Sequence, residues 1–189
     1  MSNPEILERY IAMARAAGTD VECVSETELP VRLAAALPAS GGNIAALSAS
    51  GWPRGLRERV VARLASSGFE VTAPRKEEGG GYSWDIDRLA AAPVGIVWCE
   101  HYLADTGSLV LVSGPGMGGL ATLLPEISLV LSPAQGCLGD LADYLQKTGG
   151  SPPSRITLAT GPSRTGDIEA TMTKGVHGPG KVVHFIIGA

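Results

Sequence analysis

Cysteine and long apolar runs are scarce in this 189-residue sequence, and each scarcity excludes a class of protein. The three cysteines, Cys23, Cys99 and Cys137, lie far apart and form none of the C-x-x-C pairs that zinc sites and iron–sulfur clusters typically need. We therefore expect no metal site and no cluster held by this chain alone. Cys99 ends an apolar run, which favours a small buried residue over a reactive thiol.

No segment approaches the roughly 20 apolar residues needed to span a bilayer, and no charged and then apolar leader opens the sequence. The net charge is −4, from 15 Lys and Arg against 19 Asp and Glu, and there is no basic run. Nucleic acids and acidic membranes bind proteins that carry a basic patch. We expect a cytoplasmic protein whose ligand is a small molecule, rather than a nucleic acid or a membrane.

Hydrophobic residues make up 44% of the sequence, which is ample for one large core, and helix and strand patterns alternate through the first half. Helices are predicted at residues 4–18, 27–37, 56–68 and 85–91. Strands are predicted between them, at residues 21–24, 43–48, 69–72 and 94–99. Such alternation favours an α/β fold, with a mainly parallel sheet covered by helices on both faces.

The second half breaks this alternation. Strands are predicted at residues 108–113, 127–131, 155–160 and 182–187, with one clear helix at residues 138–147. Because close strands without an intervening helix pair like hairpins, we expect some antiparallel strands here. We predict a single domain over residues 1–189 with a three-layer α/β/α architecture, and a surface loop at residues 149–153, since too few residues follow it for a second core.

The segment Gly114-Pro-Gly-Met-Gly-Gly119 satisfies the G-x-G-x-x-G pattern of dinucleotide-binding proteins, but its surroundings do not. That pattern needs a helix that starts at the glycines and an acidic residue about twenty positions later, and Pro125 ends any helix here early. We therefore expect no bound cofactor. Two roles stay open for Gly114 and Gly116: their amides line a ligand pocket, or the turn only joins two strands.

Two carboxylates, Glu100 and Asp105, follow the strand predicted at residues 94–99, where open α/β sheets bind their ligands. Each is a candidate catalytic base or nucleophile. The alternative is a polar hairpin turn, for which Asp105, Thr106 and Gly107 supply ordinary turn residues. The residue types alone favour the turn.

Small residues and residues that bind anionic oxygens concentrate in Gly161-Pro-Ser-Arg-Thr-Gly-Asp-Ile-Glu169 and Gly175-Val-His-Gly-Pro179. We expect a short helix at residues 168–174, capped by Asp167. Arg164 would then lie beside a positive helix N-terminus, an arrangement suited to a phosphate or carboxylate. The predicted ligand-binding residues are Gly161, Ser163, Arg164, Thr165 and Asp167.

Two histidines near the end of the sequence have different surroundings. His177 lies between Gly175 and Gly178-Pro179, and these small neighbours leave room for a ligand to reach its ring, so a catalytic role and a structural role stay open. His184 alternates with apolar residues in the last predicted strand and is expected to lie on a face of the sheet.

These segments resemble the lactate-utilisation protein C family, also called LutC or YkgG, whose LUD domains carry GPSxTxDIE and GVHGP segments. The likeness extends from residue 94 to the end, and the family's A-E-T-G-T segment is matched by Ala104-Asp-Thr-Gly-Ser108. Members usually have arginines where this chain has Gly118-Gly119-Leu120, and a histidine at the position of Ser128. Any ligand that those side chains hold in the family would be bound differently here.

The resemblance implies a fold like that of the NagB, RpiA and CoA-transferase proteins, and two classes of function stay open. In the first, the chain is a non-redox accessory subunit that binds a small carboxylate or phosphate, and acts with iron–sulfur and oxidoreductase partner proteins in oxidising L-lactate to pyruvate. In the second, it is a stand-alone enzyme of the sugar-phosphate isomerase or CoA-transferase type. That enzyme would use Asp105 or Glu100 as base or nucleophile and Arg164 as an anion anchor.

Overall fold

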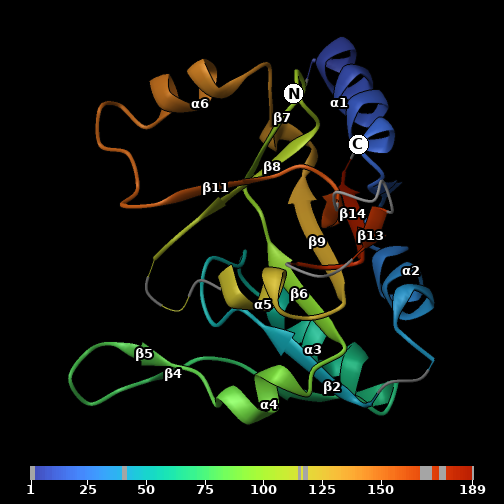
Figure 1. The fold of residues 1–189 in the computed structure, drawn as a ribbon, viewed down its shortest axis with the longest axis vertical. Coiled ribbons are helices and arrows are strands. Elements are labelled where there is room, and N and C mark those ends of the chain that lie inside the picture. The colour runs from blue at the N-terminus through green and yellow to red at the C-terminus, as the bar shows by residue number, and fades with distance from the viewer. Residues whose placement is uncertain are drawn as a thin grey trace.

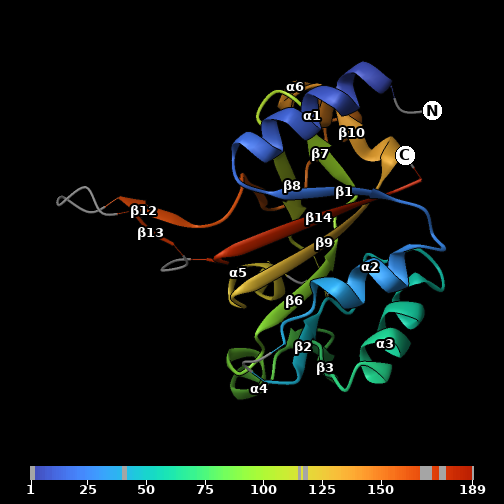
Figure 2. The same ribbon diagram turned by 90° about the vertical axis from the view of Figure 1, so that its right-hand side faces the viewer.

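A six-stranded parallel sheet forms the centre of the protein (Figure 1), and its strand order is β1-β14-β9-β6-β2-β3 (Figure 2). The computed structural model describes residues 3–39, 42–114, 116, 119–166, 172–174 and 178–188. The six strands are β1 (Asp20–Val24), β2 (Ile44–Leu47), β3 (Glu70–Thr72), β6 (Val94–Trp98), β9 (Ile127–Pro133) and β14 (Lys181–Ile187). The mainly parallel sheet predicted from the alternation of helices and strands is confirmed.

Helices cover both faces of this sheet. One face packs against α2 (Leu29–Ala36) and α3 (Leu56–Ser66), and the other against α1 (Pro4–Ala16), α4 (Ile86–Ala90) and α5 (Gly119–Leu123) (Figure 2). Side chains along a strand point alternately to the two faces, so Val130 of β9 joins one core cluster, while Leu129 and Leu131 join the other. The predicted three-layer architecture is confirmed.

A second, four-stranded sheet completes the layer that contains α1. Its order is β10-β7-β8-β11, with strands β7 (His101–Leu103), β8 (Ser108–Val112), β10 (Cys137–Leu138) and β11 (Ile156–Ala159). Strand β8 pairs antiparallel with both of its neighbours, which confirms the antiparallel strands predicted for the second half. Helix α6 (Leu141–Lys147) begins later than predicted, because Cys137 and Leu138 pair with β7 and Asp140 caps the helix at Asp143 N.

Local signals set several helix ends. The Asn3 side chain accepts a hydrogen bond from Glu5 N at the start of α1, and Gly18 follows its end with a φ of 96°. Gly68, with a φ of 83°, follows α3 in the same way. Only glycine adopts such positive φ values without strain, so these two positions end the helices as predicted.

The helix predicted at residues 168–174 is wrong where the structure describes it. Met172–Lys174 forms strand β13, which pairs antiparallel with β12 (Arg164–Gly166), and Thr165 faces Thr173 across the pair. Strand pairing depends on a partner strand as well as on local propensity, which explains why the sequence pattern did not predict a hairpin. This β12–β13 hairpin projects from the body of the protein (Figure 2). The case for an anion site at Arg164 therefore no longer rests on a helix dipole.

The remaining elements are short. Strands β4 (Arg75–Lys76) and β5 (Tyr82–Ser83) form a hairpin whose loop contains three consecutive glycines, at residues 79–81. A 3-10 turn, η1, spans Ala134–Gly136. In the part of the chain that the structure describes, no helix has the length and apolar character to cross a bilayer.

Candidate functional site

Glu100 and Arg164, which the stand-alone enzyme would need in one pocket, lie at opposite edges of the parallel sheet. Glu100 follows the carboxyl end of β6, whereas Arg164 shares a cavity with Ser128 and Val182, which lie near the amino ends of β9 and β14. Parallel strands place all their amino ends at one edge and all their carboxyl ends at the other. The structure therefore separates Glu100 from Arg164.

The loop that carries Gly161, Ser163 and Arg164 borders a cavity of 290 Å³, which we call the loop cavity. Its floor contains Ser128, which is 0% exposed and whose Oγ has no hydrogen-bond partner among the described residues. Leaving a buried hydroxyl unpaired costs about 1–3 kcal/mol. A polar group that reached this hydroxyl would remove that cost.

Arg164 lies on the rim of the loop cavity and contacts the end of α1. Its Nη2 donates a hydrogen bond to Ala17 O at 3.0 Å, so the guanidinium interacts favourably with the negative end of the helix. Gly161 holds the loop close to the same carbonyl, because a Cβ at this position, where φ is 75°, would lie 2.3 Å from Ala17 O. Arginine has five N–H donors, so further donors remain for a ligand.

Asp105 lies in the turn between β7 and β8, as the hairpin interpretation predicted. Hydroxyl groups connect this turn to the loop cavity: Thr160 and Ser108 oxygens are 2.6 Å apart, Ser108 donates to Thr106 at 2.8 Å, and Thr106 donates to Asp105 at 3.1 Å. Thr160 lines the loop cavity and Asp105 does not. Asp105 is therefore placed to orient Thr160, rather than to touch a ligand there.

Glu100 lines two adjoining cavities at the carboxyl edge of the sheet, an outer one of 670 Å³ and an inner one of 180 Å³. Both also contain Gly51 and Trp98, and we call the pair the edge cleft. The Glu100 carboxylate accepts a hydrogen bond from Trp98 Nε1 at 2.7 Å. The edge cleft and the loop cavity share Thr122 of α5, which lies between them.

His101 lines the inner cavity and was missed by the sequence analysis. Its Nδ1 is buried and has no hydrogen-bond partner among the described residues. Burial lowers the pKa of His101, as does the charge of Lys147, so the ring is neutral at pH 7. The sequence shows this histidine beside the two carboxylates after β6, but its residue type alone does not assign it a role.

Gly114 and Gly116 border a hollow, and Gly116 also holds the segment after β2 in place. Gly116 O accepts hydrogen bonds from Ala49 N at 2.8 Å and Ser50 N at 3.2 Å, which fixes the segment after β2. Gly114 and Gly116 both line a hollow of 280 Å³ beside Tyr82 and Trp84. Both roles left open by the sequence are thus compatible with the geometry.

Two predicted site residues, Asp167 and His177, lie outside the described residues, and of Thr165 only the backbone is described. In the described ranges, no group of three or more His, Cys, Asp or Glu side chains is arranged to hold a metal ion. Cys99 is buried as predicted, and its burial raises the pKa of the thiol to about 12.

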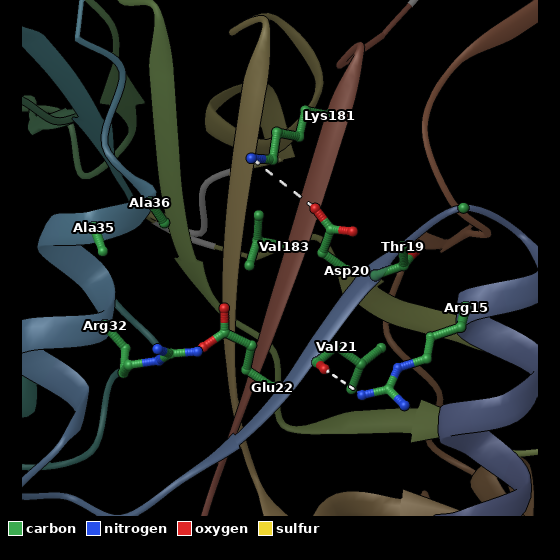
Figure 3. A pocket seen from close by; sticks show the side chains of 11 residues that line it. Arg15, Thr19, Asp20, Val21, Glu22, Arg32, Ala35, Ala36, Lys181 and Val183 are labelled. Atoms are coloured by element: carbon green, nitrogen blue, oxygen red, sulfur yellow. Dashed lines mark hydrogen bonds and ion pairs between the residues drawn. The ribbon is translucent and has the colours of Figure 1, made fainter.

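A groove of 490 Å³ runs along the edge strand β1 between α1 and α2 (Figure 3). Its charged side chains are paired: Arg32 with Glu22 at 2.7 Å, and Lys181 with Asp20 at 3.9 Å. Arg15 donates to Val21 O at 2.9 Å and so covers a carbonyl of the open strand edge. Charged side chains protect edge strands from pairing with other chains, and this groove needs no ligand to explain it.

Comparison with known proteins gives consistent matches. The LUD domain family model matches residues 7–187. Uncharacterized protein YkgG of Escherichia coli (strain K12) is 35% identical over 125 residues, which are 59% of this chain and 54% of that protein. Lactate utilization protein C of Bacillus subtilis (strain 168) is 31% identical over 119 residues, 56% of this chain and 50% of that protein. The chain thus spans about half the length of these curated relatives.

The fold has a counterpart among solved structures. The crystal structure of a DUF162 family protein from Deinococcus radiodurans covers 100% of this chain and 99% of its own, with a TM-score of 0.67 and 19% sequence identity. At that identity the likeness concerns the fold. Because the family model covers nearly the whole sequence, this chain belongs to the LUD domain family.

Proposed function

We propose that this chain is a non-redox accessory subunit in L-lactate utilisation, and that it acts with an iron–sulfur protein and an oxidoreductase in the oxidation of L-lactate to pyruvate. The relative from Bacillus subtilis bears the name Lactate utilization protein C, and the LUD domain of this chain supports a related role. The three separated cysteines of the sequence suit a subunit whose redox centres are held by its partners.

The observation that carries the ligand part of this proposal is the unpartnered Ser128 hydroxyl on the floor of the loop cavity. A small carboxylate in this cavity accepts hydrogen bonds from Ser128 Oγ and from the free N–H groups of Arg164. Such charge-assisted bonds are roughly twice as strong as neutral ones. Thr160 donates its proton to Ser108, so its oxygen can only accept a hydrogen bond, from a hydroxyl group of the ligand.

Calorimetry on the purified chain with L-lactate, pyruvate and phosphate tests this ligand site. We expect Arg164→Ala to weaken binding of the carboxylate about tenfold or more, since a hydrogen bond to a charged group contributes about 1.5–3 kcal/mol. Ser128→Ala should weaken binding as well, yet raise the free energy of unfolding of the unliganded protein by about 1 kcal/mol, because it removes an unpaired buried hydroxyl.

Arg155→Ala is the matched control, because Arg155 is an exposed arginine next to β11 that does not line the loop cavity. It should bind the ligand like the wild type. If calorimetry detects no binding of any of the three ligands, or if Arg164→Ala binds a ligand as tightly as the wild type, the proposed ligand site is wrong. The subunit role is tested separately by gel filtration of the chain with an iron–sulfur partner from the same genome.

A stand-alone enzyme of the isomerase or CoA-transferase type is the second candidate, and one observation favours it. Glu100 and the neutral ring of His101 line the same inner cavity, and so offer a carboxylate and a base at the carboxyl edge. Arg164 is not available there as an anion anchor. Turnover of a sugar phosphate or an acyl-CoA by the chain alone, lost in His101→Ala, would establish this function.

A further inference from the structure

We propose that the edge cleft is a second ligand site and that it binds a mononucleotide, with the base on the indole surfaces of Trp52 and Trp98, a ribose hydroxyl on Glu100, and the phosphate at Arg54 and Arg59. The site is separate from the loop cavity and goes beyond the function proposed above.

The place and size of the cleft suit a ligand of this kind. Pro133 at the end of β9 and Ile187 at the end of β14 line the outer cavity together with Trp98 at the end of β6. Open α/β sheets bind ligands beyond the carboxyl ends of their strands. The outer cavity measures 670 Å³, within the range of about 300–1,000 Å³ typical of small-molecule sites.

The two tryptophans can offer a ligand their ring faces, but not their N–H groups. Trp52 Nε1 donates to Ser48 Oγ at 2.7 Å, and Trp98 Nε1 donates to Glu100 Oε2 at 2.7 Å. With both N–H groups engaged, the indoles are held in place, and what they can offer a ligand is their π surfaces. Any nucleobase can stack on such a surface, because every base has a flat π face.

The cationic side of the cleft is available to a phosphate. Arg54 has no hydrogen bond or ion pair with any described residue, and it lies just before Gly55, the N-cap of the 11-residue helix α3. Arg59 pairs with Glu26 at 3.0 Å, but the two side chains are 53% and 69% exposed, so this pair is weak and easily exchanged. Two guanidiniums beside a helix N-terminus match the oxygens of a phosphate.

Glu100, on the acidic side of the edge cleft, favours a ligand that also carries hydroxyl groups. Glu100 uses Oε2 for Trp98, and its other oxygen can accept a further hydrogen bond. A carboxylate in this position binds ribose hydroxyls in other nucleotide sites. Because the cleft holds both acids and guanidiniums, a ligand that is only an anion would meet repulsion from Glu100, whereas a nucleotide satisfies both sides.

Tryptophan fluorescence of a Trp84→Phe background tests the site, since the remaining indoles are then Trp52 and Trp98. Titration with AMP should change the emission in a saturable way, and adenosine and ribose 5-phosphate should each bind at least about tenfold more weakly. Arg54→Ala should weaken AMP binding about tenfold and leave adenosine binding unchanged. Arg9→Ala is the matched control, because Arg9 is exposed on α1, lines none of these cavities and should leave AMP binding unchanged.

Arg164→Ala in the same background keeps the two proposals apart, since AMP binding should be unaffected by it. No saturable change with AMP, or AMP binding that Arg54→Ala leaves intact, overturns the nucleotide site. Ribose 5-phosphate binding as tightly as AMP also overturns it, because the indoles would then contribute nothing to the base. Circular dichroism of each variant confirms that it is folded before titration.

Discussion

Replacing His184 with phenylalanine is expected to lower the free energy of unfolding by about 4 kcal/mol. His184 is 0% exposed, and its two ring nitrogens lie 2.7 Å from Tyr10 OH and 2.7 Å from Ser132 Oγ. Phenylalanine keeps most of the ring volume but leaves both hydroxyls buried without this partner. Each such group costs about 1–3 kcal/mol.

A second set of variants separates this hydrogen-bond effect from altered packing. Adding Tyr10→Phe and Ser132→Ala to His184→Phe removes the stranded hydroxyls, and replacement of both partners of a hydrogen bond by apolar groups is nearly neutral. The triple variant should therefore regain most of the lost stability in urea unfolding followed by circular dichroism. If His184→Phe alone stays within 1 kcal/mol of the wild type, the network is not a main source of stability.

The pH dependence of the free energy of unfolding is a second test of the hydrogen bonds made by His184. Burial lowers the pKa of His184 to about 3, whereas the unfolded chain has the ordinary value of 6.5. Above pH 6.5 the ring is neutral in both states and contributes no pH dependence. Below it the unfolded chain binds the proton first, so stability should fall by about 3 kcal/mol between pH 6.5 and pH 4. In His184→Phe this contribution to the slope is absent.

The sequence predicted that His184 lies on a face of the sheet, and this is correct, but its partners were beyond sequence reasoning. Tyr10 lies 174 positions away and Ser132 lies 52 positions away, so only the folded sheet brings them together. Local signals were more successful. Gly18 and Gly68 end their helices because positive φ is a property of the residue itself, and no tertiary contact is needed to predict it.

The candidate site was predicted in part, and its errors have the same physical origin. The Gly161–Arg164 loop borders a cavity, yet the helix predicted after it is wrong at Met172–Lys174, because strand pairing with β12 depends on the pairing partner as well as on local propensity. Glu100 and Asp105 are five positions apart, and the intervening strand β7 carries the chain from one site toward the other. Ser128 and His101 were present in the sequence, but only the folded structure shows that each has a buried polar atom without a partner among the described residues.

Gly95→Ala is expected to lower the free energy of unfolding by at least about 3 kcal/mol, the upper range for overpacking a core. Gly95 lies within β6, directly below α5, and a Cβ at this position would be 1.6 Å from Ala121 O. Backbone atoms cannot yield as a flexible side chain does, so α5 must move away from the sheet.

Because Thr122 of α5 lines both the loop cavity and the edge cleft, the same substitution should weaken ligand binding at both sites together. Gly119→Ala is the matched control: it lies at the start of α5, no heavy atom lies within 4 Å of its added Cβ, and alanine favours the helix. In thermal unfolding, the melting temperature of Gly119→Ala should equal or exceed that of the wild type, and the melting temperature of Gly95→Ala should be well below it. Equal melting temperatures for Gly95→Ala and the wild type would show that α5 does not rest on β6 as described, and the two sites would then lack their common support.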